Sequence, residues 1–203
     1  MAGPFEGRMK ASEDRNRVLR ERGYDVPAMR ARLVQCARPV SGKVLDVGTG
    51  PGRLAILLAK GEGAQVTTLE FEGEEIEFAR WNAARAGVEA RIRFLRGDAA
   101  RLPFPPGVFD LVASANLIHH MDAPDLAVLE MVRVCKRGGR VVVADLNPAG
   151  LNLLAEVHAQ LGGKHDAGPM TVSEAVERLS PEGLAIERWE EGFQVLFRLM
   201  RVA

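Results

Sequence analysis

The hydrophobic positions of this chain follow two alternating periods. From residue 43 onward, short β-branched or apolar runs alternate with segments whose apolar residues recur every three or four positions. The short runs predict strands at 43–48, 64–70, 91–97, 108–115 and 140–146. The longer segments predict helices at 54–61, 73–87 and 123–139. This alternation predicts an α/β fold with a parallel sheet that helices cover on both faces.

The N-terminal region lies outside this alternation and has a helical pattern. We expect one helix at 12–22, with Ser12 as its N-cap and Gly23 as its stop. We expect a second helix from Pro27 to about Ala37, because proline suits the first turn of a helix.

The C-terminal region also departs from the alternation. Helical stretches near 150–161 and 171–179 precede an apolar segment at 185–202. That segment reads as two strands with a turn near Glu191 and Gly192, so it predicts a closing antiparallel hairpin.

Length and composition fit one globular domain. The chain has 203 residues, of which 47% are hydrophobic and 27% charged. It has no apolar run near the roughly 20 residues of a membrane helix, and residues 1–15 lack a signal-peptide core. Cys36 and Cys135 form neither a disulfide framework nor a CxxC pair. We therefore expect a cytoplasmic protein with reduced thiols and no membrane contact.

The net charge of zero argues against a strong, sequence-independent affinity for nucleic acid. The charge is nevertheless uneven. Residues 1–43 hold 10 basic and 5 acidic residues, while residues 44–203 hold 17 and 22. The basic N-terminal region fits a solvated helical face, and a patch for an anionic ligand or nucleic acid is the alternative.

A glycine-rich turn joins the first expected strand to the helix after it. Gly48, Gly50 and Gly52 let the backbone turn sharply, so a ligand can lie against main-chain N–H groups. A dinucleotide fingerprint would need GxGxxG, but position 53 is Arg. Asp46 stands two residues before the first glycine, where an anion suits a positively charged amino group better than a phosphate.

Two further acids follow the next two strands. Glu70 lies 20 residues beyond Gly50, where a carboxylate can accept hydrogen bonds from both hydroxyls of a ribose. Asp98 follows the third strand and can accept from an adenine amine. Each has a simpler alternative, since Glu70 can be an ordinary strand-ending acid and Asp98 can cap a turn.

Together these segments resemble the class I S-adenosylmethionine-dependent methyltransferases, especially the type 11 group with its small quinone-biosynthesis-like enzymes. VLDVGTGPG at 44–52 is similar to the family's first motif, and Glu70 to its ribose-binding acid. The other matching segments are Gly97-Asp98-Ala99 with the following LPFPPGVFDLV, SANLIHHMDAP at 114–124 and GGRVVVADLNP at 138–148. Several motifs in the right order make the resemblance specific.

The resemblance implies a doubly wound, Rossmann-like sheet of seven strands in the order 3-2-1-4-5-7-6, with strand 7 antiparallel. It also implies one methyltransferase domain over residues 1–203. Within it, cover helices occupy 1–40, the cofactor-binding core 41–148, and acceptor-side helices with the closing hairpin 149–203.

The implied cofactor is S-adenosyl-L-methionine. The methionine part would meet Asp46, Gly48, Thr49 and Gly50, while Glu70 would hold the ribose. The remaining implied contacts are Phe71 against the adenine face, Asp98 and Ala99 at the adenine edge, and Asn116 near the methyl group.

The resemblance assigns no catalytic residue. His119 and His120 suit a general base, but their pattern is common across the type 11 group regardless of acceptor, which favours a structural or cofactor-pocket role. Asp145 and Asn147 are similar to part of the metal site of catechol-type methyltransferases. That site needs another carboxylate where Asn116 stands, so we expect no metal.

Within the segment 150–170, residues 158–170 fall where the family places an acceptor-side insertion. This stretch is interpreted either as a mobile lid or as a flexible surface loop.

The acceptor is expected to be a small molecule. No [DNS]PP[YF] or Pro-Cys motif follows the fourth strand, which disfavours adenine amino and cytosine C5 methylation. The alternatives are an RNA or protein methyltransferase and a non-catalytic S-adenosylmethionine-binding regulatory protein. Arg53 and Asp46 disfavour a nicotinamide dehydrogenase.

Overall fold

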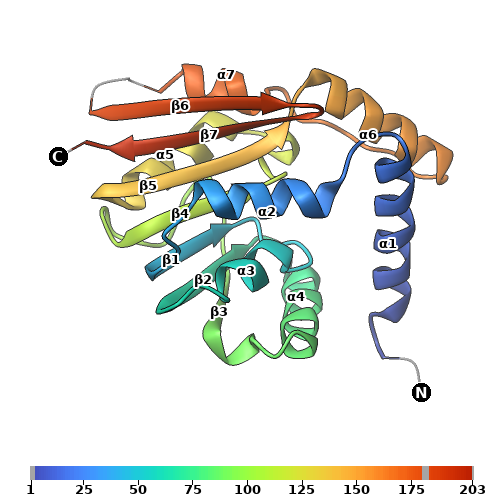
Figure 1. The fold of residues 1–203 in the computed structure, drawn as a ribbon, viewed down its shortest axis with the longest axis horizontal. Helices are drawn as coiled ribbons and strands as arrows, with labels where there is room; N and C mark the ends of the chain where they lie inside the picture. The colour runs from blue at the N-terminus through green and yellow to red at the C-terminus, as the bar shows by residue number, and fades with distance from the viewer. Residues whose placement is uncertain (1–2, 180–182, 203) are drawn as a thin grey trace.

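The computed structural model describes residues 3–179 and 183–202 and contains a seven-stranded sheet in the order β3-β2-β1-β4-β5-β7-β6. β7 runs antiparallel to both of its neighbours, whereas β1 to β5 pair in parallel (Figure 1). The strands are β1 (Gly42–Val47), β2 (Ala64–Glu70), β3 (Ile92–Arg96), β4 (Phe109–Ala115), β5 (Cys135–Leu146), β6 (Leu184–Glu191) and β7 (Gln194–Arg201). The expected fold class and strand order are confirmed.

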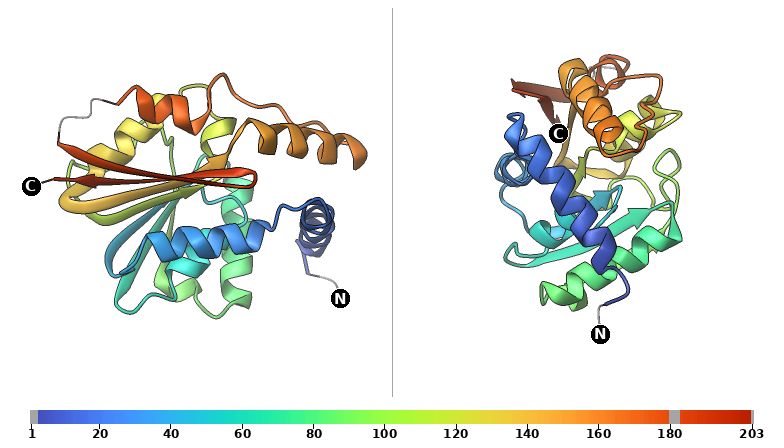
Figure 2. Two further views of the ribbon diagram at one scale, coloured as in Figure 1. Left: turned by 45° about the horizontal axis from the view of Figure 1, so that its top comes forward. Right: turned by 90° about the vertical axis from the view of Figure 1, so that its right-hand side faces the viewer.

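The helices lie on both faces of this sheet and beyond one end of it (Figures 1 and 2). They are α1 (Glu6–Glu21), α2 (Val26–Cys36), α3 (Arg53–Leu58), α4 (Gly73–Arg85), α5 (Pro124–Val134), α6 (Pro148–Gln160) and α7 (Val172–Glu177). Two short 3-10 helices are η1 (Glu89–Arg91) and η2 (Ile118–His120). None of the helices in the described ranges has the length and apolar character of a membrane span.

Alternate side chains of the central strands build two separate cores. Leu111 packs with the helices α2, α3 and α4, whereas the next residue, Val112, packs with α5 and α7. This follows from the two-residue period of a strand, which turns successive side chains to opposite faces. Each such fully buried aliphatic side chain contributes about 1.5–3 kcal/mol to stability.

The first helix begins earlier than its pattern predicts. α1 starts at Glu6, and Ser12 lies inside the helix rather than at its N-cap, so the predicted start was wrong. Phe5 packs on Phe78 and Trp81 of α4, with ring centroids 5.3 and 6.0 Å apart. This long-range contact anchors the first turn, and no local pattern reveals it.

The fifth strand also begins earlier than predicted. The expected helix at 123–139 ends at Val134, and Cys135 opens a strand of 12 residues. Cys135 pairs with Phe109 of β4 and is buried, which raises the pKa of its thiol to about 11. Gly138, at φ 72°, lets the chain pass an irregularity in register before regular pairing resumes at Arg140.

α1 and α6 lie side by side beyond the carboxyl ends of the strands (Figures 1 and 2). They share a small third core whose buried members are Leu19, Tyr24, Val26, Leu146, Leu153 and Val157. Ligands of doubly wound sheets bind at this end, so the two helices cover the edge where a ligand is expected.

Candidate active site

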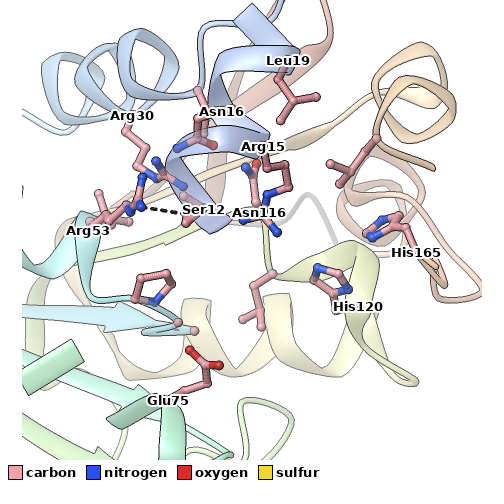
Figure 3. A pocket seen from close by; sticks show the side chains of 18 of the residues that line it. Ser12, Arg15, Asn16, Leu19, Arg30, Arg53, Glu75, Asn116, His120 and His165 are labelled. Atoms are coloured by element: carbon pink, nitrogen blue, oxygen red, sulfur yellow. Dashed lines mark hydrogen bonds between the residues drawn. The ribbon is translucent and has the colours of Figure 1, made fainter. Parts of the chain in front are cut away.

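A cavity of about 710 Å³ lies at the carboxyl ends of β1, β2 and β4. Its floor is the glycine loop after β1, and α1, the start of α2 and α6 contribute the opposite walls. Figure 3 shows Arg30, Arg53 and Ser12 on one side of it and His120 and His165 on the other. Cavities of this size hold cofactors and small molecules.

The glycine loop can adopt its path only without side chains. Gly48 has φ 84°, and a Cβ there would lie 2.9 Å from both Leu117 Cδ atoms. Gly52 has φ 76°, and its Cβ would lie 3.0 Å from the Ala79 Cβ. Gly50, in contrast, has no atom within 4 Å of such a Cβ, so its backbone faces open space at the cavity.

Asp46 lies behind this loop and is fully buried. Its Oδ2 accepts a hydrogen bond from the Thr68 hydroxyl at 2.8 Å, and Thr68 in turn contacts the Thr49 hydroxyl at 2.6 Å. Asp46 Oδ1 has no partner among the described residues. Burial raises the pKa of Asp46 to about 7, so a positively charged ligand group would favour its ionised form.

Glu70 connects β2 to the glycine loop. Its Oε2 accepts from the Gly50 N–H at 2.8 Å, and its Oε1 accepts from the Phe71 N–H at 2.8 Å. The carboxylate lines the cavity, and Oε2 retains a lone pair for a further donor.

The structure brings five of the nine expected cofactor residues to the cavity wall. These are Gly48, Thr49, Gly50, Glu70 and Asn116. Asp46 is buried behind them, and Phe71, Asp98 and Ala99 lie outside the wall. Phe71 is 60% exposed, and Asp98 accepts from the Ala100 N–H at 2.8 Å, which is the turn-capping role considered as its alternative.

A polar network holds Asn116 at the end of β4. Asn116 has φ 55°, and its Nδ2 donates to the Tyr24 hydroxyl at 3.3 Å. Gln194 donates to Asn116 Oδ1 at 2.6 Å and also to the Tyr24 hydroxyl. Burial raises the pKa of Tyr24 to about 12, which keeps its phenol neutral. Tyr24 and Gln194 have no sequence signal, because 170 positions separate them.

Arginines form a second group in the cavity wall. Arg53 follows the glycine motif, and Arg15 and Arg30 belong to the basic N-terminal region for which a patch for an anionic ligand was the alternative. Arg15, Arg30 and Arg53 line the cavity and make no ion pair with any carboxylate in the described part of the chain. Arg53 donates to the Ser12 hydroxyl at 2.7 Å (Figure 3). Burial, together with the charges of Arg53 and Arg15, lowers the pKa of Arg30 to about 10. These cations make the wall suitable for an anionic group.

The histidines of the chain also converge on the cavity. His119, His120, His158 and His165 all line it. The Nδ1 atom of His119 contacts Asp145 Oδ1, and the His119 N–H donates to Asp145 Oδ2 at 3.1 Å. Desolvation and neighbouring histidines lower the pKa of His120 and of His165 to about 4, so both imidazoles are neutral at pH 7.

Known proteins are similar to this chain in sequence and in fold. The family described as "Methyltransferase domain" matches residues 45–143. The demethylmenaquinone methyltransferase of Thermus thermophilus is 34% identical over 198 residues, which cover 91% of this chain and 89% of that enzyme. The chain belongs to the class I S-adenosylmethionine-dependent methyltransferases. S-adenosylmethionine is the cofactor of this family.

Two other methyltransferases are also similar to this chain. Ajmaline N-methyltransferase of Rauvolfia serpentina is 31% identical over 168 residues, and the match spans 77% of this chain but 58% of that enzyme. A methyltransferase structure from Aquifex aeolicus superposes with a TM-score of 0.60 over 85% of this chain and 98% of that one, at 20% identity. That superposition establishes the fold alone, because one fold supports many reactions.

Proposed function

We propose that this chain transfers the methyl group of S-adenosylmethionine to a small-molecule acceptor. The observation that carries the proposal is that the glycine loop, Glu70 and Asn116 line one cavity at the carboxyl ends of the strands. Such a cavity has room for a cofactor at the strand ends and for an acceptor below α1 and α6. When bound, the cofactor supplies a methyl group that its sulfonium already activates.

The residues of the loop suit the polar parts of this cofactor. Asp46 Oδ1 is a buried acceptor without a partner among the described residues. The α-ammonium group of the cofactor would donate a hydrogen bond to it, directly or through one water. Gly50 leaves open space for close approach of a ligand to the backbone. Glu70 Oε2 retains a lone pair for a ribose hydroxyl.

The arginines of the cavity wall suit the negatively charged carboxylate of the cofactor. Arg53 follows the glycine loop at the start of α3, and Arg30 of α2 lies on the same side of the cavity as Arg53 (Figure 3), so their guanidinium groups would hold this carboxylate. Asn116 lies between this wall and the histidines, where its amide would orient the methionine end. These contacts position the reactants, and α1 and α6 exclude water from them.

The size and surroundings of the cavity favour a small acceptor. The relatives that support this choice are named for a quinone and an alkaloid, demethylmenaquinone and ajmaline. The net charge of zero disfavours a nucleic acid, whose binding would depend on phosphate contacts. We propose a largely apolar acceptor, because the lining of the cavity includes Leu117, Leu154 and Leu161.

A transfer assay tests this function. The protein is incubated with S-adenosylmethionine and a panel of quinols, phenols, alkaloid amines and RNA, and products are detected by mass. We expect a gain of one methyl group on a small molecule and none on RNA. Methylation confined to RNA, or tight binding of RNA that weakens steeply with salt, would overturn the small-acceptor proposal.

A further inference from the structure

All four histidines of the sequence lie at one place, although they come from three segments. His119 and His120 belong to η2, His158 to the last turn of α6, and His165 to the stretch between α6 and α7. Ring centroids lie 4.0 Å apart for His119 and His120, 5.2 Å for His119 and His165, and 5.0 Å for His120 and His165. The proposed methyl transfer does not require this cluster.

His119 is held in one tautomer and one orientation. It is 2% exposed, and its Nδ1–H points at the buried carboxylate of Asp145, which also accepts from the His119 backbone N–H. Because Nδ1 faces Asp145, Nε2 is the nitrogen of this ring that would offer its lone pair to a cation, and it is buried without a partner among the described residues. A carboxylate behind a histidine is the arrangement that orients imidazole ligands toward metal ions.

The stretch that carries His165 is fastened to the same place. The Gly168 N–H donates to the His119 carbonyl at 2.6 Å, and a Cβ at Gly168 would lie 2.4 Å from the Met121 carbonyl oxygen. At the other end, His158 Nδ1 donates to the Lys164 carbonyl at 3.2 Å. These contacts keep His165 against η2, and the His165 Nε2 atom is also buried without a described partner.

The geometry points to a site for a divalent transition-metal ion, with Zn²⁺ as the best fit, formed by His119, His120 and His165. One nitrogen of each ring lies within 4.8 Å of the others. A tetrahedral Zn²⁺ site requires nitrogens about 3.3 Å apart, so the rings need to close by at most about 1.5 Å. Three imidazoles with an open fourth position suit zinc, cobalt, nickel or copper, whereas Mg²⁺ and Ca²⁺ prefer oxygen ligands.

This donor set differs from the carboxylate site considered for Asp145 and Asn147. Here Asp145 acts behind His119 and not as a ligand. Its charge, with that of Asp166 beside His165, offsets part of the charge of a cation, while Arg15 nearby opposes it. Without an ion, buried imidazole nitrogens lose water and gain no partner, which is unfavourable.

Cobalt binding to the 203-residue chain, made without a histidine tag and treated with EDTA, tests this site. We expect Co²⁺ to bind one to one with the visible absorption of a four-coordinate nitrogen site, and Zn²⁺ to displace it. Zn²⁺ at 100 times its dissociation constant should raise the thermal midpoint by about 5–10 °C. This readout does not require methyl transfer, so it is independent of the proposed function.

Variants of two partly exposed ligands make the test specific. The pair His120→Ala and His165→Ala should lose the absorption and weaken Co²⁺ binding at least 100-fold, while circular dichroism shows an unchanged fold. His158→Ala is the comparison variant, because His158 lines the same cavity but lies outside the three-histidine group; it removes only the hydrogen bond to Lys164, so it should keep the one-to-one stoichiometry and weaken Co²⁺ binding far less than the double substitution. Absence of Co²⁺ binding to the natural protein at millimolar concentration, or binding that survives the double substitution, would overturn the site.

Discussion

The carboxylate of Glu70 accepts a hydrogen bond from the Gly50 N–H at 2.8 Å and thereby joins the end of β2 to the glycine loop after β1. Twenty positions separate the two residues. The parallel register of β1 and β2, in which Val47 pairs with Leu69, brings them together. Glu70 thus shapes the loop and, in the function proposed above, also holds the ribose.

Replacing Glu70 should weaken cofactor binding more than it weakens the fold. Glu70→Ala removes an acceptor for charge-assisted hydrogen bonds, so we expect the affinity for S-adenosylhomocysteine to fall at least tenfold, or about 1.4 kcal/mol. Calorimetric titration measures this change. Glu72→Ala is the control, because Glu72 is the next acid along the chain and is exposed. Equal losses in the two variants would contradict the role given to Glu70.

Gly48 should tolerate substitution less than another glycine of similar conformation. Gly48→Ala forces a Cβ to within 2.9 Å of Leu117, whereas Gly87→Ala, at φ 69°, meets no atom within 4 Å. Both changes strain the left-handed backbone by about 1 kcal/mol, and overpacking adds about 1–3 kcal/mol at Gly48 alone. Urea denaturation of both variants measures the difference. Matching free energies of unfolding would show that Leu117 moves away without cost.

Asp46 should make stability fall as pH rises toward neutrality. The pKa of Asp46 is about 7 in the folded chain, against an ordinary value of 3.8, so the folded state binds the extra proton between these values. Its contribution to stability is therefore present below about pH 4 and is lost as pH rises through 7. The loss is on the order of 4 kcal/mol.

Comparison with Asp46→Asn isolates this titration. The lowered pKa values of His120 and His165 give a slope of the opposite sign between about pH 4 and 6.5 in both proteins. The free energy of unfolding of the natural protein, measured relative to that of the variant, should therefore fall steadily as pH rises from 4 to 8. A difference that is constant with pH would mean that Asp46 is ionised throughout.

The hydroxyl of Tyr24 should stabilise the network at Asn116. Tyr24→Phe keeps the ring that packs on Phe193 but removes the acceptor for Asn116 and Gln194. Because this leaves buried donors without that acceptor, we expect a loss of about 1–3 kcal/mol in the free energy of unfolding. A double-mutant cycle with Gln194→Ala should give a coupling above about 0.5 kcal/mol. Additive effects would show that the hydrogen bond contributes nothing.

The sequence pattern correctly predicted elements that have the same surroundings along their whole length. The strand at 64–70 has the bounds of β2, because it is buried in the sheet and flanked by turns. The strand order followed from the resemblance and not from the pattern. Cys135 was misplaced because an apolar run of helical spacing continues into a strand without a break, and only pairing with Phe109 decides the boundary.

The site was predictable only where its residues belong to motifs. Gly48, Glu70 and Asn116 stand in motif segments at strand ends, and the structure brings them to one cavity. Tyr24 and Arg30 come from outside those segments. Their place depends on how α1 and α2 pack across the sheet, which a one-dimensional pattern does not contain.

The choice of cofactor decides whether the cavity at the glycine loop has the function given to it. Isothermal titration of the purified chain with S-adenosylhomocysteine, and separately with NAD, measures that choice. We predict one-to-one binding of S-adenosylhomocysteine with a dissociation constant near 1 μM, about −8 kcal/mol, and no heat of binding with NAD. Tight binding of NAD without binding of S-adenosylhomocysteine would contradict a site for S-adenosylmethionine.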